Sequence, residues 1–171
     1  MKALRIVIAL MVIAASVVAA IRIVIPPWEC NVEKSRVNTA TVLADRARSS
    51  YEQSGRAYQM VQICEKCLKE IPNDSEFRML LGKNQQLLGK YDSAELNYRR
   101  SLALTERPET YANLALLQLD RGEVEEARKS LFHAAIFDMA YVEWVSAPMR
   151  HELYQAVLKR HRQLGARGLP H

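Results

Sequence analysis

The 171-residue sequence lacks the motifs by which most catalytic sites are recognised. It contains only six glycines, and none belongs to a glycine-rich loop of the kind that binds phosphate. No serine lies in a nucleophile motif. The histidines are scattered and do not form a spaced set of metal ligands; they are His133, His151, His161 and His171. We therefore expect no enzymatic activity, no cofactor and no bound metal.

Cysteine is scarce, with three residues in the chain. Cys64 and Cys67 form a Cys-x-x-Cys motif, but Leu68 follows it where haem attachment needs a histidine, and no second ligand pair completes a zinc site. A redox motif normally begins a helix after a strand, whereas this one lies within a predicted helix. Both cysteines are interpreted as core residues, with a thiol-redox pair as the alternative. Cys30 is expected to be exposed, where it could pair between chains in an oxidising compartment.

Positive charge exceeds negative charge only slightly over most of the chain. The sequence carries 24 Lys and Arg against 19 Asp and Glu, a formal net charge of +5. Lys2, Arg5 and Arg22 supply three of these excess charges, within a segment that contains no acidic residue. Because no basic helix interleaved with aromatic residues occurs in the rest of the chain, we expect no nucleic-acid binding.

An apolar run near the N-terminus predicts a membrane-spanning helix. Residues 6–25 are apolar except for Ser16 and Arg22, and a span needs about 20 such residues. Arg22 lies near the end of the run, so its long side chain could reach the headgroups. Residues 1–5 precede the run as a short basic flank. The pattern predicts a transmembrane signal-anchor helix over residues 6–25.

The segment after the apolar run is predicted to be irregular. Pro26 and Pro27 are expected to end the helix, because proline lacks the backbone N–H that a helix interior needs. Trp28 lies where an interfacial aromatic residue belongs. Residues 26–40 are then predicted to form a polar tether before the first repeat.

Two properties of the N-terminal segment remain open at this point. A cleaved signal peptide is the alternative to an anchor, with Val18-Ala19-Ala20 as the cleavage site, but the apolar run continues past that site to Ile25. Basic residues before the run favour a cytoplasmic N-terminus and an extracytoplasmic repeat domain, which would be periplasmic in a bacterium. Lys34 and Arg36 after the run weaken this orientation.

The remainder of the chain repeats itself. A shift of 33 residues aligns Leu81-Gly82 with Leu114-Ala115 and Ala94 with Ala127. A shift of 34 residues in the other direction gives a poorer third copy. The predicted boundaries are 41–74 for a degenerate first repeat, 75–107 for the second, 108–140 for the third, 141–164 for C-terminal capping helices and 165–171 for a flexible tail.

This pattern resembles the tetratricopeptide repeat family, whose units of about 34 residues carry a Trp-x2-Leu-Gly-x2-Tyr, Ala-x3-Phe and Pro signature. Leu81-Gly82 fills the Leu-Gly position, Ala94 and Tyr98 fill the Ala-x3-Phe position, and Ala127 with Leu131 fills it again. The Trp position never holds Trp. The resemblance implies an all-α helical solenoid of about three helix-turn-helix repeats with a C-terminal capping helix, placed behind the N-terminal transmembrane helix.

Local signals place the helix ends. Gly55, Gly89 and Gly122 each follow a helical stretch, where a C-terminal cap favours the left-handed conformation of glycine. Asn73 with Glu76 three residues later matches a capping box. The predicted helices outside the second unit span 38–53, 56–71, 108–121, 124–137 and 148–163.

The resemblance implies that the first helix of each unit lines a concave groove that holds an extended peptide or a helix of a protein partner. The residues that this comparison assigns to the groove are Asp45, Arg46, Ser49, Glu52, Met79, Lys83, Gln86, Asn113, Leu116 and Asp120. One subgroup clamps a free carboxylate with Lys and Asn. Asn113 matches that clamp, but Met79 and Lys83 replace the expected Lys and Asn, so we expect no carboxylate clamp. The alternative for the whole set is a solvated helix face.

The sequence thus predicts a membrane-tethered adaptor or scaffold that mediates protein–protein interaction in the assembly or maturation of a membrane or envelope complex. One alternative is an accessory subunit whose anchor packs against other membrane subunits. The small residues that would permit such packing are Ala14, Ala15, Ser16, Ala19 and Ala20. Another alternative is a soluble secreted repeat protein after signal cleavage.

Overall fold

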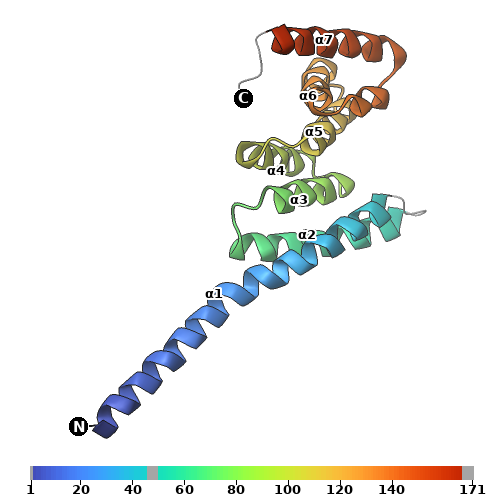
Figure 1. Cartoon of the computed structure of the whole chain (residues 1–171). Helices are drawn as coiled ribbons and strands as arrows, with labels where there is room; N and C mark the ends of the chain where they lie inside the picture. The colour runs from blue at the N-terminus through green and yellow to red at the C-terminus, as the bar shows by residue number, and fades with distance from the viewer. Residues whose placement is uncertain (1, 46–49, 167–171) are drawn as a thin grey trace.

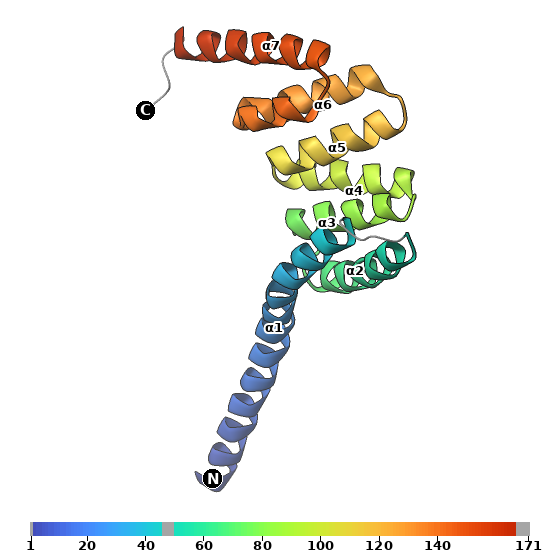
Figure 2. The same ribbon diagram turned by 90° about the vertical axis from the view of Figure 1, so that its right-hand side faces the viewer.

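The computed structural model of the chain describes residues 2–45 and 50–166. These residues form helices and contain no strand. The elements in chain order are α1 (Lys2–Asp45), α2 (Ser50–Glu70), α3 (Ser75–Leu87), α4 (Tyr91–Leu104), α5 (Pro108–Asp120), α6 (Val124–Phe137), the 3-10 helix η1 (Met139–Trp144) and α7 (Ala147–Ala166). Figures 1 and 2 show α2 to α6 stacked in chain order, with the N-terminal half of α1 projecting from one end and α7 at the other.

Helix α1 continues through Pro26 and Pro27. The prediction that these prolines end the helix is therefore wrong, and residues 26–40 are helical rather than an irregular tether. A proline inside a helix costs about 3 kcal/mol or more, because it removes one hydrogen bond and crowds the preceding turn. Contacts beyond the prolines offset this cost: Cys30 and Val37 are buried in a core shared with α2 and α3. The second half of α1 is thus the first helix of the first pair.

The membrane-spanning potential of α1 agrees with its sequence. Within the part of the chain that the structure describes, one helix is long and apolar enough to cross a membrane, between Met11 and Ala44. The described side chains from Met11 to Ile25 are exposed on the isolated chain. Length and composition alone do not separate a span from a signal sequence, which would satisfy the same criteria.

The first helical pair differs from its predicted boundaries. The first helix ends at Asp45 and the second begins at Ser50, so both boundaries lie before the predicted helix end near residue 54. Gly55 lies inside α2 and is not a C-terminal cap. The same core packs this pair together, with Met60, Val61 and Cys64 of α2 facing α1 and α3.

The second and third pairs follow the predicted repeat. Helices α5 and α6 end within one residue of the predicted positions. Gly89 and Gly122 have φ values of 71° and 76°, which non-glycine residues rarely adopt. Two backbone hydrogen bonds close the turn of each pair. In the second pair, the N–H of Lys90 donates to the carbonyl of Gln85, and the N–H of Gly89 donates to that of Gln86. In the third pair, the N–H of Glu123 donates to the carbonyl of Gln118, and the N–H of Gly122 donates to that of Leu119. These are Schellman turns, as the position of the glycines requires.

The N-terminal cap of α3 is shifted by one residue from the prediction. Asp74, and not Asn73, accepts a hydrogen bond from the backbone N–H of Phe77, at 2.9 Å. Its other carboxylate oxygen accepts from Lys34 of α1, at 2.6 Å. The cap therefore also ties the long first helix to the second repeat.

Small residues allow the paired helices to approach one another. A Cβ atom on Gly82 would lie 2.8 Å from ring carbons of Tyr98 and 3.1 Å from the carbonyl oxygen of Ala94. Ala94, Ala115 and Ala127 are fully buried at the corresponding close contacts. The small-residue positions of the sequence repeat are thus explained by sterics.

The second and third helix pairs each contain an equivalent buried hydrogen bond between their two helices. Asn97 donates to the side-chain oxygen of Gln85 at 2.9 Å, and Ser130 donates to that of Gln118 at 2.8 Å. The four positions are related by the 33-residue shift of the sequence repeat. Because buried polar groups must be satisfied, these bonds fix the register of each pair.

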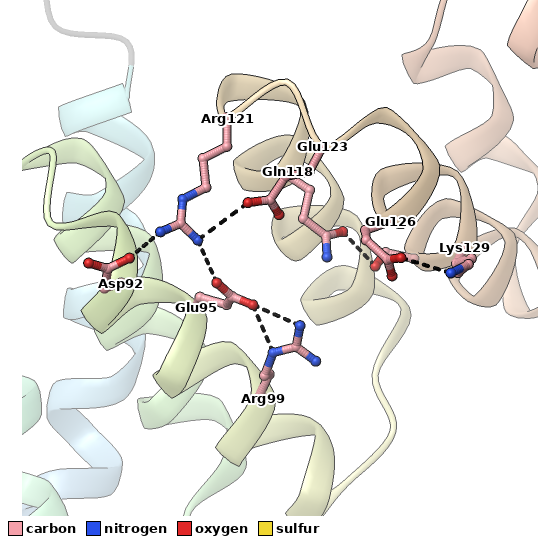
Figure 3. A network of polar contacts seen from close by, with 9 residues as sticks. Asp92, Glu95, Arg99, Gln118, Arg121, Glu123, Glu126 and Lys129 are labelled. Carbon is pink, nitrogen blue, oxygen red and sulfur yellow. Dashed lines mark hydrogen bonds and ion pairs between the residues drawn. The ribbon is translucent and has the colours of Figure 1, made fainter.

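Arg121 links the second and third pairs through an ion network (Figure 3). It follows α5 and forms ion pairs with Asp92 and Glu95 of α4. Glu95 also accepts a hydrogen bond from Arg99, at 2.9 Å. The hydrogen bond from Arg99, together with Arg121, holds the pKa of Glu95 below its usual value.

The last helix closes the stack as predicted for a capping helix. Leu153 and Val157 of α7 are buried against α6 and η1, in a core that includes Leu131 and Val142. The opposite face of α7 is exposed and largely polar. Most of the predicted flexible tail, residues 167–171, lies outside the described residues.

Candidate functional site

A hollow of about 410 Å³ lies along the first helices of the second and third pairs, α3 and α5. We call it the groove hollow. Its lining residues are Gln53, Lys83, Gln86, Leu87, Tyr91, Asn113, Leu116, Asp120 and Trp144. Five of the residues that the sequence assigned to a groove are among them: Lys83, Gln86, Asn113, Leu116 and Asp120. Residues from three helix pairs and from η1 therefore meet at one surface.

Helical periodicity explains how these five residues face the same side. Lys83 and Gln86 are three residues apart on α3, and Asn113, Leu116 and Asp120 are three and four residues apart on α5. Such spacings place side chains on one face of a helix. Because α3 and α5 occupy equivalent positions in successive pairs, their two faces combine into one lining.

One hydrogen-bonded chain crosses the hollow. Gln86 donates to the carboxylate of Asp120 at 3.1 Å and accepts from the hydroxyl of Tyr98 at 2.9 Å. The buried ring of Tyr98 packs against Gly82, so this chain extends from the core to the surface. Gln86 and Asp120 are thus held in place before any ligand binds.

Asn113 offers hydrogen-bonding groups that its surroundings leave open. Among the residues that the structure describes, no hydrogen bond engages its side-chain amide. An amide carries two donor hydrogens and one acceptor oxygen, and so matches the backbone of an extended peptide. Leu116 and Leu87 add apolar surface beside it.

The aromatic part of the lining was missed at the sequence level. Trp144 falls in the segment predicted to form C-terminal capping helices, residues 141–164, but it borders the groove hollow and is about half exposed. Its ring packs edge to face on Tyr141, with ring centroids 5.0 Å apart. Tyr91 and Gln53 were also missed. Trp144 follows the last repeat, so no repeat position could assign it to the groove; its size and exposure were the available signal.

Of the other residues assigned to the groove, Met79 and Glu52 are described by the structure and do not line the groove hollow. Met79 is half-buried and packs against the cores on both sides of α3. Glu52 lies on an exposed face of α2, where it accepts hydrogen bonds from Arg56. Asp45 is the last residue of α1, and its side chain is outside the described part of the structure. Arg46 and Ser49 lie outside the described residues altogether.

Two of the three cysteines form a disulfide that was not predicted from the sequence. Cys30 and Cys67 are bonded within the chain, with Cα atoms 5.4 Å apart, in the range typical of disulfides. Cys30 is only 4% exposed, so the predictions that it is exposed and pairs between chains are wrong. Cys67 is a core residue, as predicted, but it is also half of this bond. Sequence spacing could not identify the pair, because α1 had been predicted to end before Cys30.

Cys64 is a buried free thiol one helical turn from Cys67. Burial raises its pKa to about 12, and the negative charges of Glu65 and Asp74 act in the same direction. A thiol with so high a pKa is mostly protonated and a poor nucleophile at neutral pH. Because Cys67 is bonded to Cys30 and Cys64 is free, the two residues are not paired with each other, contrary to the alternative of a redox Cys-x-x-Cys pair. No group of three or more metal-ligand side chains occurs in residues 11–21, 23–44 and 50–163, where side chains are described.

Antiparallel helix pairs stacked on one another, with a concave lining from their first helices, define a helical solenoid. No protein-family model matches the sequence, and a comparison with curated proteins finds no match. Among solved structures, the chain is similar to TTC0263, a thermophilic TPR protein of Thermus thermophilus. The similarity has a TM-score of 0.55 and 21% identity, and it covers 77% of this chain and 71% of the other. The fold is that of the tetratricopeptide repeat.

Two structures of SycD, a type III secretion translocator chaperone of Yersinia enterocolitica, are also similar to the chain. One has a TM-score of 0.46 and 25% identity, and covers 72% of this chain and 86% of SycD. The other, a complex with a peptide of the translocator YopD, has a TM-score of 0.48 and 23% identity, and covers 78% and 95%. The resemblance to the tetratricopeptide repeat family is therefore confirmed at the level of the fold, by the similarity to TTC0263.

Proposed function

We propose that the protein is a membrane-tethered adaptor that holds an extended or helical segment of a partner protein in the groove hollow. The observation that supports this proposal is the composition of the lining. Polar groups of Lys83 and Asn113 lie beside the apolar Leu87 and Leu116 and the aromatic Trp144. Such a mixture can engage both the backbone and the side chains of a peptide.

We place the repeats on the extracytoplasmic side of a membrane, where the adaptor would serve the assembly of a membrane or envelope complex. The Cys30–Cys67 disulfide supports this side, because disulfides persist in oxidising compartments and are rare in the cytosol. Lys2 and Arg5 before the apolar run support the same orientation. Anchoring also raises the effective concentration of the groove at the membrane, so that a weak affinity suffices.

A pull-down in mild detergent tests the groove. Full-length tagged protein is compared with a variant that carries Lys83→Ala and Asn113→Ala, and bound proteins are identified by mass spectrometry. The matched control carries Lys90→Ala and Asn73→Ala, since these residues are of the same types but are exposed outside the hollow. The proposal expects a partner that is lost only in the groove variant. Equal recovery with both variants would contradict it.

Deletion of residues 1–25 separates the proposal from its main alternative. If partners persist in the groove variant but disappear with this deletion, the anchor carries the association, and the protein is an accessory subunit of a larger membrane complex. The exposed alanines of α1 would provide the contact surface for that alternative, because small residues let membrane helices pack closely. An intact-mass measurement of the mature protein decides the third possibility, a secreted form cleaved after Ala20.

A further inference from the structure

A second hollow, larger than the groove hollow, lies between α1 and α2 beside the end of the apolar run. Its volume is about 730 Å³, and we call it the juxtamembrane crevice. Its lining residues are Pro26, Trp28, Glu29, Cys30, Val32, Glu33, Ile63, Lys66, Cys67 and Glu70. None of these residues lines the groove hollow, so the two surfaces are distinct.

The crevice has the form of a channel between two helix faces. On α2, the lining residues Lys66, Cys67 and Glu70 follow Ile63 by three, four and seven positions. On α1, the lining residues at 29, 30 and 33 follow Pro26 by the same numbers, so each set lies on one helix face. The Cys30–Cys67 disulfide joins the two faces, and both cysteines are buried. A channel formed by two adjoining helices accepts a third helix along its length.

Apolar side chains in the crevice have no cover within the described chain. Trp28 is 68% exposed and Val32 is 47% exposed, although both contribute to the lining. Exposed apolar surface beside polar residues is typical of an interaction site. Trp28 is also of the residue type that contributes most often to binding energy at interfaces.

The charges around the crevice are predominantly acidic. The lining contains three carboxylates, Glu29, Glu33 and Glu70, and one cation, Lys66. Glu33 already pairs with Arg36 at 2.9 Å, whereas Glu29, Glu70 and Lys66 form no ion pair with any residue that the structure describes. With Glu33 paired, the two remaining carboxylates outnumber the one lysine, and this acidic excess favours a cationic occupant and disfavours anionic lipid headgroups.

The crevice continues a face of α1 that begins inside the apolar run. In ideal helical geometry, carried through Pro26 and Pro27, residues 18 apart are separated by about five full turns, so we expect Ala15 on the same side as Glu33. Ala19, four residues after Ala15, lies on this side too, and both are exposed. Two small residues at this spacing let a neighbouring membrane helix approach closely. A helix packed there would leave the membrane at the crevice.

We propose that the juxtamembrane crevice binds a helical segment of a partner membrane protein, namely the first turns that follow the partner's own span and that carry apolar residues together with Lys or Arg. The partner's span packs against Ala15 and Ala19, and its cations meet Glu29 and Glu70. This inference rests on the proposed membrane anchoring, but it uses a surface separate from the groove hollow and names the chemistry of a second partner site.

Energy transfer from Trp28 tests the inference. The full-length protein with Trp144→Phe, in which Trp28 is the remaining tryptophan, is placed in nanodiscs of zwitterionic lipid. The probe is a synthetic peptide with a span of about 20 Leu and Ala residues, a following helix of Leu and Lys, and a dansyl acceptor in that helix. An otherwise identical peptide carries Glu in place of Lys. We expect half-saturation with the Lys peptide at a concentration about tenfold lower than with the Glu peptide.

Two charge variants make the test specific. Glu29→Lys with Glu70→Lys should abolish or reverse the preference for the Lys peptide. The control, Glu109→Lys with Glu152→Lys, makes the same change of charge at exposed positions outside the crevice and should retain the preference. Equal affinity for the two peptides, or a preference that survives in the crevice variant, would overturn the inference.

Failure of the inference is distinguishable from failure of the proposed function. Protein that does not co-elute with nanodiscs would refute membrane anchoring, and the inference with it. Protein that inserts but binds both peptides equally would refute the crevice alone. The groove variant, with Lys83→Ala and Asn113→Ala, is expected to bind the Lys peptide as the parent does, while losing the partner of the groove hollow.

Discussion

Gly82 and Gly55 both lie inside helices, but only Gly82 faces another side chain. A Cβ atom on Gly82 would meet the buried ring of Tyr98 at 2.8 Å, whereas nothing lies within 4 Å of a Cβ on Gly55. Alanine at Gly82 is expected to destabilise the fold by about 1–3 kcal/mol, because crowding outweighs the gain in helix propensity. Alanine at Gly55 is expected to stabilise it by about 0.5–1 kcal/mol.

Urea unfolding of the two variants in mild detergent, followed by circular dichroism, measures both effects. Each variant serves as the control for the other, since the substitution is the same. A stabilised Gly82→Ala variant would mean that α3 and α4 are less closely packed than described.

The thiol of Cys64 is expected to be inert in the folded protein. Because burial raises its pKa to about 12 from an ordinary value of 9.0, its thiolate population at pH 8 is lower by roughly 1,000-fold than in the unfolded chain. A chromogenic disulfide reagent should therefore detect no thiol in the native, unreduced protein. Denaturation should expose the thiol of Cys64, and reduction of the denatured chain should bring the total to three.

The outcome also tests the disulfide assignment. Three thiols in the denatured, unreduced protein would show that Cys30 and Cys67 are not bonded. Rapid reaction of the native protein would show that Cys64 is accessible, and would restore the alternative of thiol chemistry at the Cys-x-x-Cys motif.

At the scale of elements, Glu95 couples α4 to the end of α5. The hydrogen bond from Arg99, together with Arg121, lowers the pKa of Glu95, so the folded protein keeps this carboxylate charged to a lower pH than the unfolded chain does. Its contribution is therefore present above the unfolded pKa of about 4.5 and is lost as the pH falls through the folded pKa. Glu95→Gln is expected to cost about 0.5–1 kcal/mol at pH 7 and to lose less stability on acidification than the parent does.

Chemical denaturation at several pH values between 7 and 3 measures this difference. Glu125→Gln is the control, because Glu125 pairs with Arg128 on its own helix and links no two elements. It should cost less, about 0.3 kcal/mol. Identical pH profiles for Glu95→Gln and the parent would argue against the network that joins the two repeats.

The second and third helix pairs could be predicted from sequence because their constraints are local. Gly89 and Gly122 must adopt positive φ at the turns, and Gly82 must admit Tyr98, so each position carries a recognisable residue. The first pair has no such markers. Residues 46–49, which separate α1 from α2 in the sequence, include no glycine.

The predicted end of the first helix is wrong because long-range contacts override a local signal. Pro26 and Pro27 would usually end a helix, but the disulfide at Cys30 and the buried Val37 hold the following turns against α2 and α3. The lining of the groove hollow was partly predictable, because some of its residues occupy positions of the sequence repeat. Lys83 and Asn113 occupy repeat positions, whereas Trp144 reaches the hollow from η1, outside any repeat.

At the scale of the whole molecule, the disulfide joins the projecting helix to the stack. Cys30 and Cys67 are separated by 37 residues, and closing a loop of this length stabilises the folded state by about 4 kcal/mol in the chain-entropy model. The variant with Cys30→Ser and Cys67→Ser is expected to unfold at a lower urea concentration than the parent. A reducing agent should lower the parent's midpoint and leave that of the variant unchanged.

Cys64→Ala is the control for this experiment, since it keeps the disulfide while it removes a cysteine. Its unfolding should respond to reductant as the parent's does. If reductant has no effect on the parent, the bond between Cys30 and Cys67 contributes nothing to stability, and the oxidising location proposed for the repeats loses its support.

Because α1 is continuous, it also fixes the orientation of the helical stack relative to the apolar segment. The apolar segment and the first helix of the stack are one helix. Beyond the prolines this helix is fixed by the disulfide, by the 2.6 Å contact of Lys34 with Asp74 and by a 2.8 Å hydrogen bond from Asn84 to Thr41. One residue added between the two parts would turn the stack by about 100° around the helix axis and raise it by about 1.5 Å. The number of residues between the two parts of α1 therefore sets both the rotation of the groove hollow about the helix axis and its distance from the apolar segment.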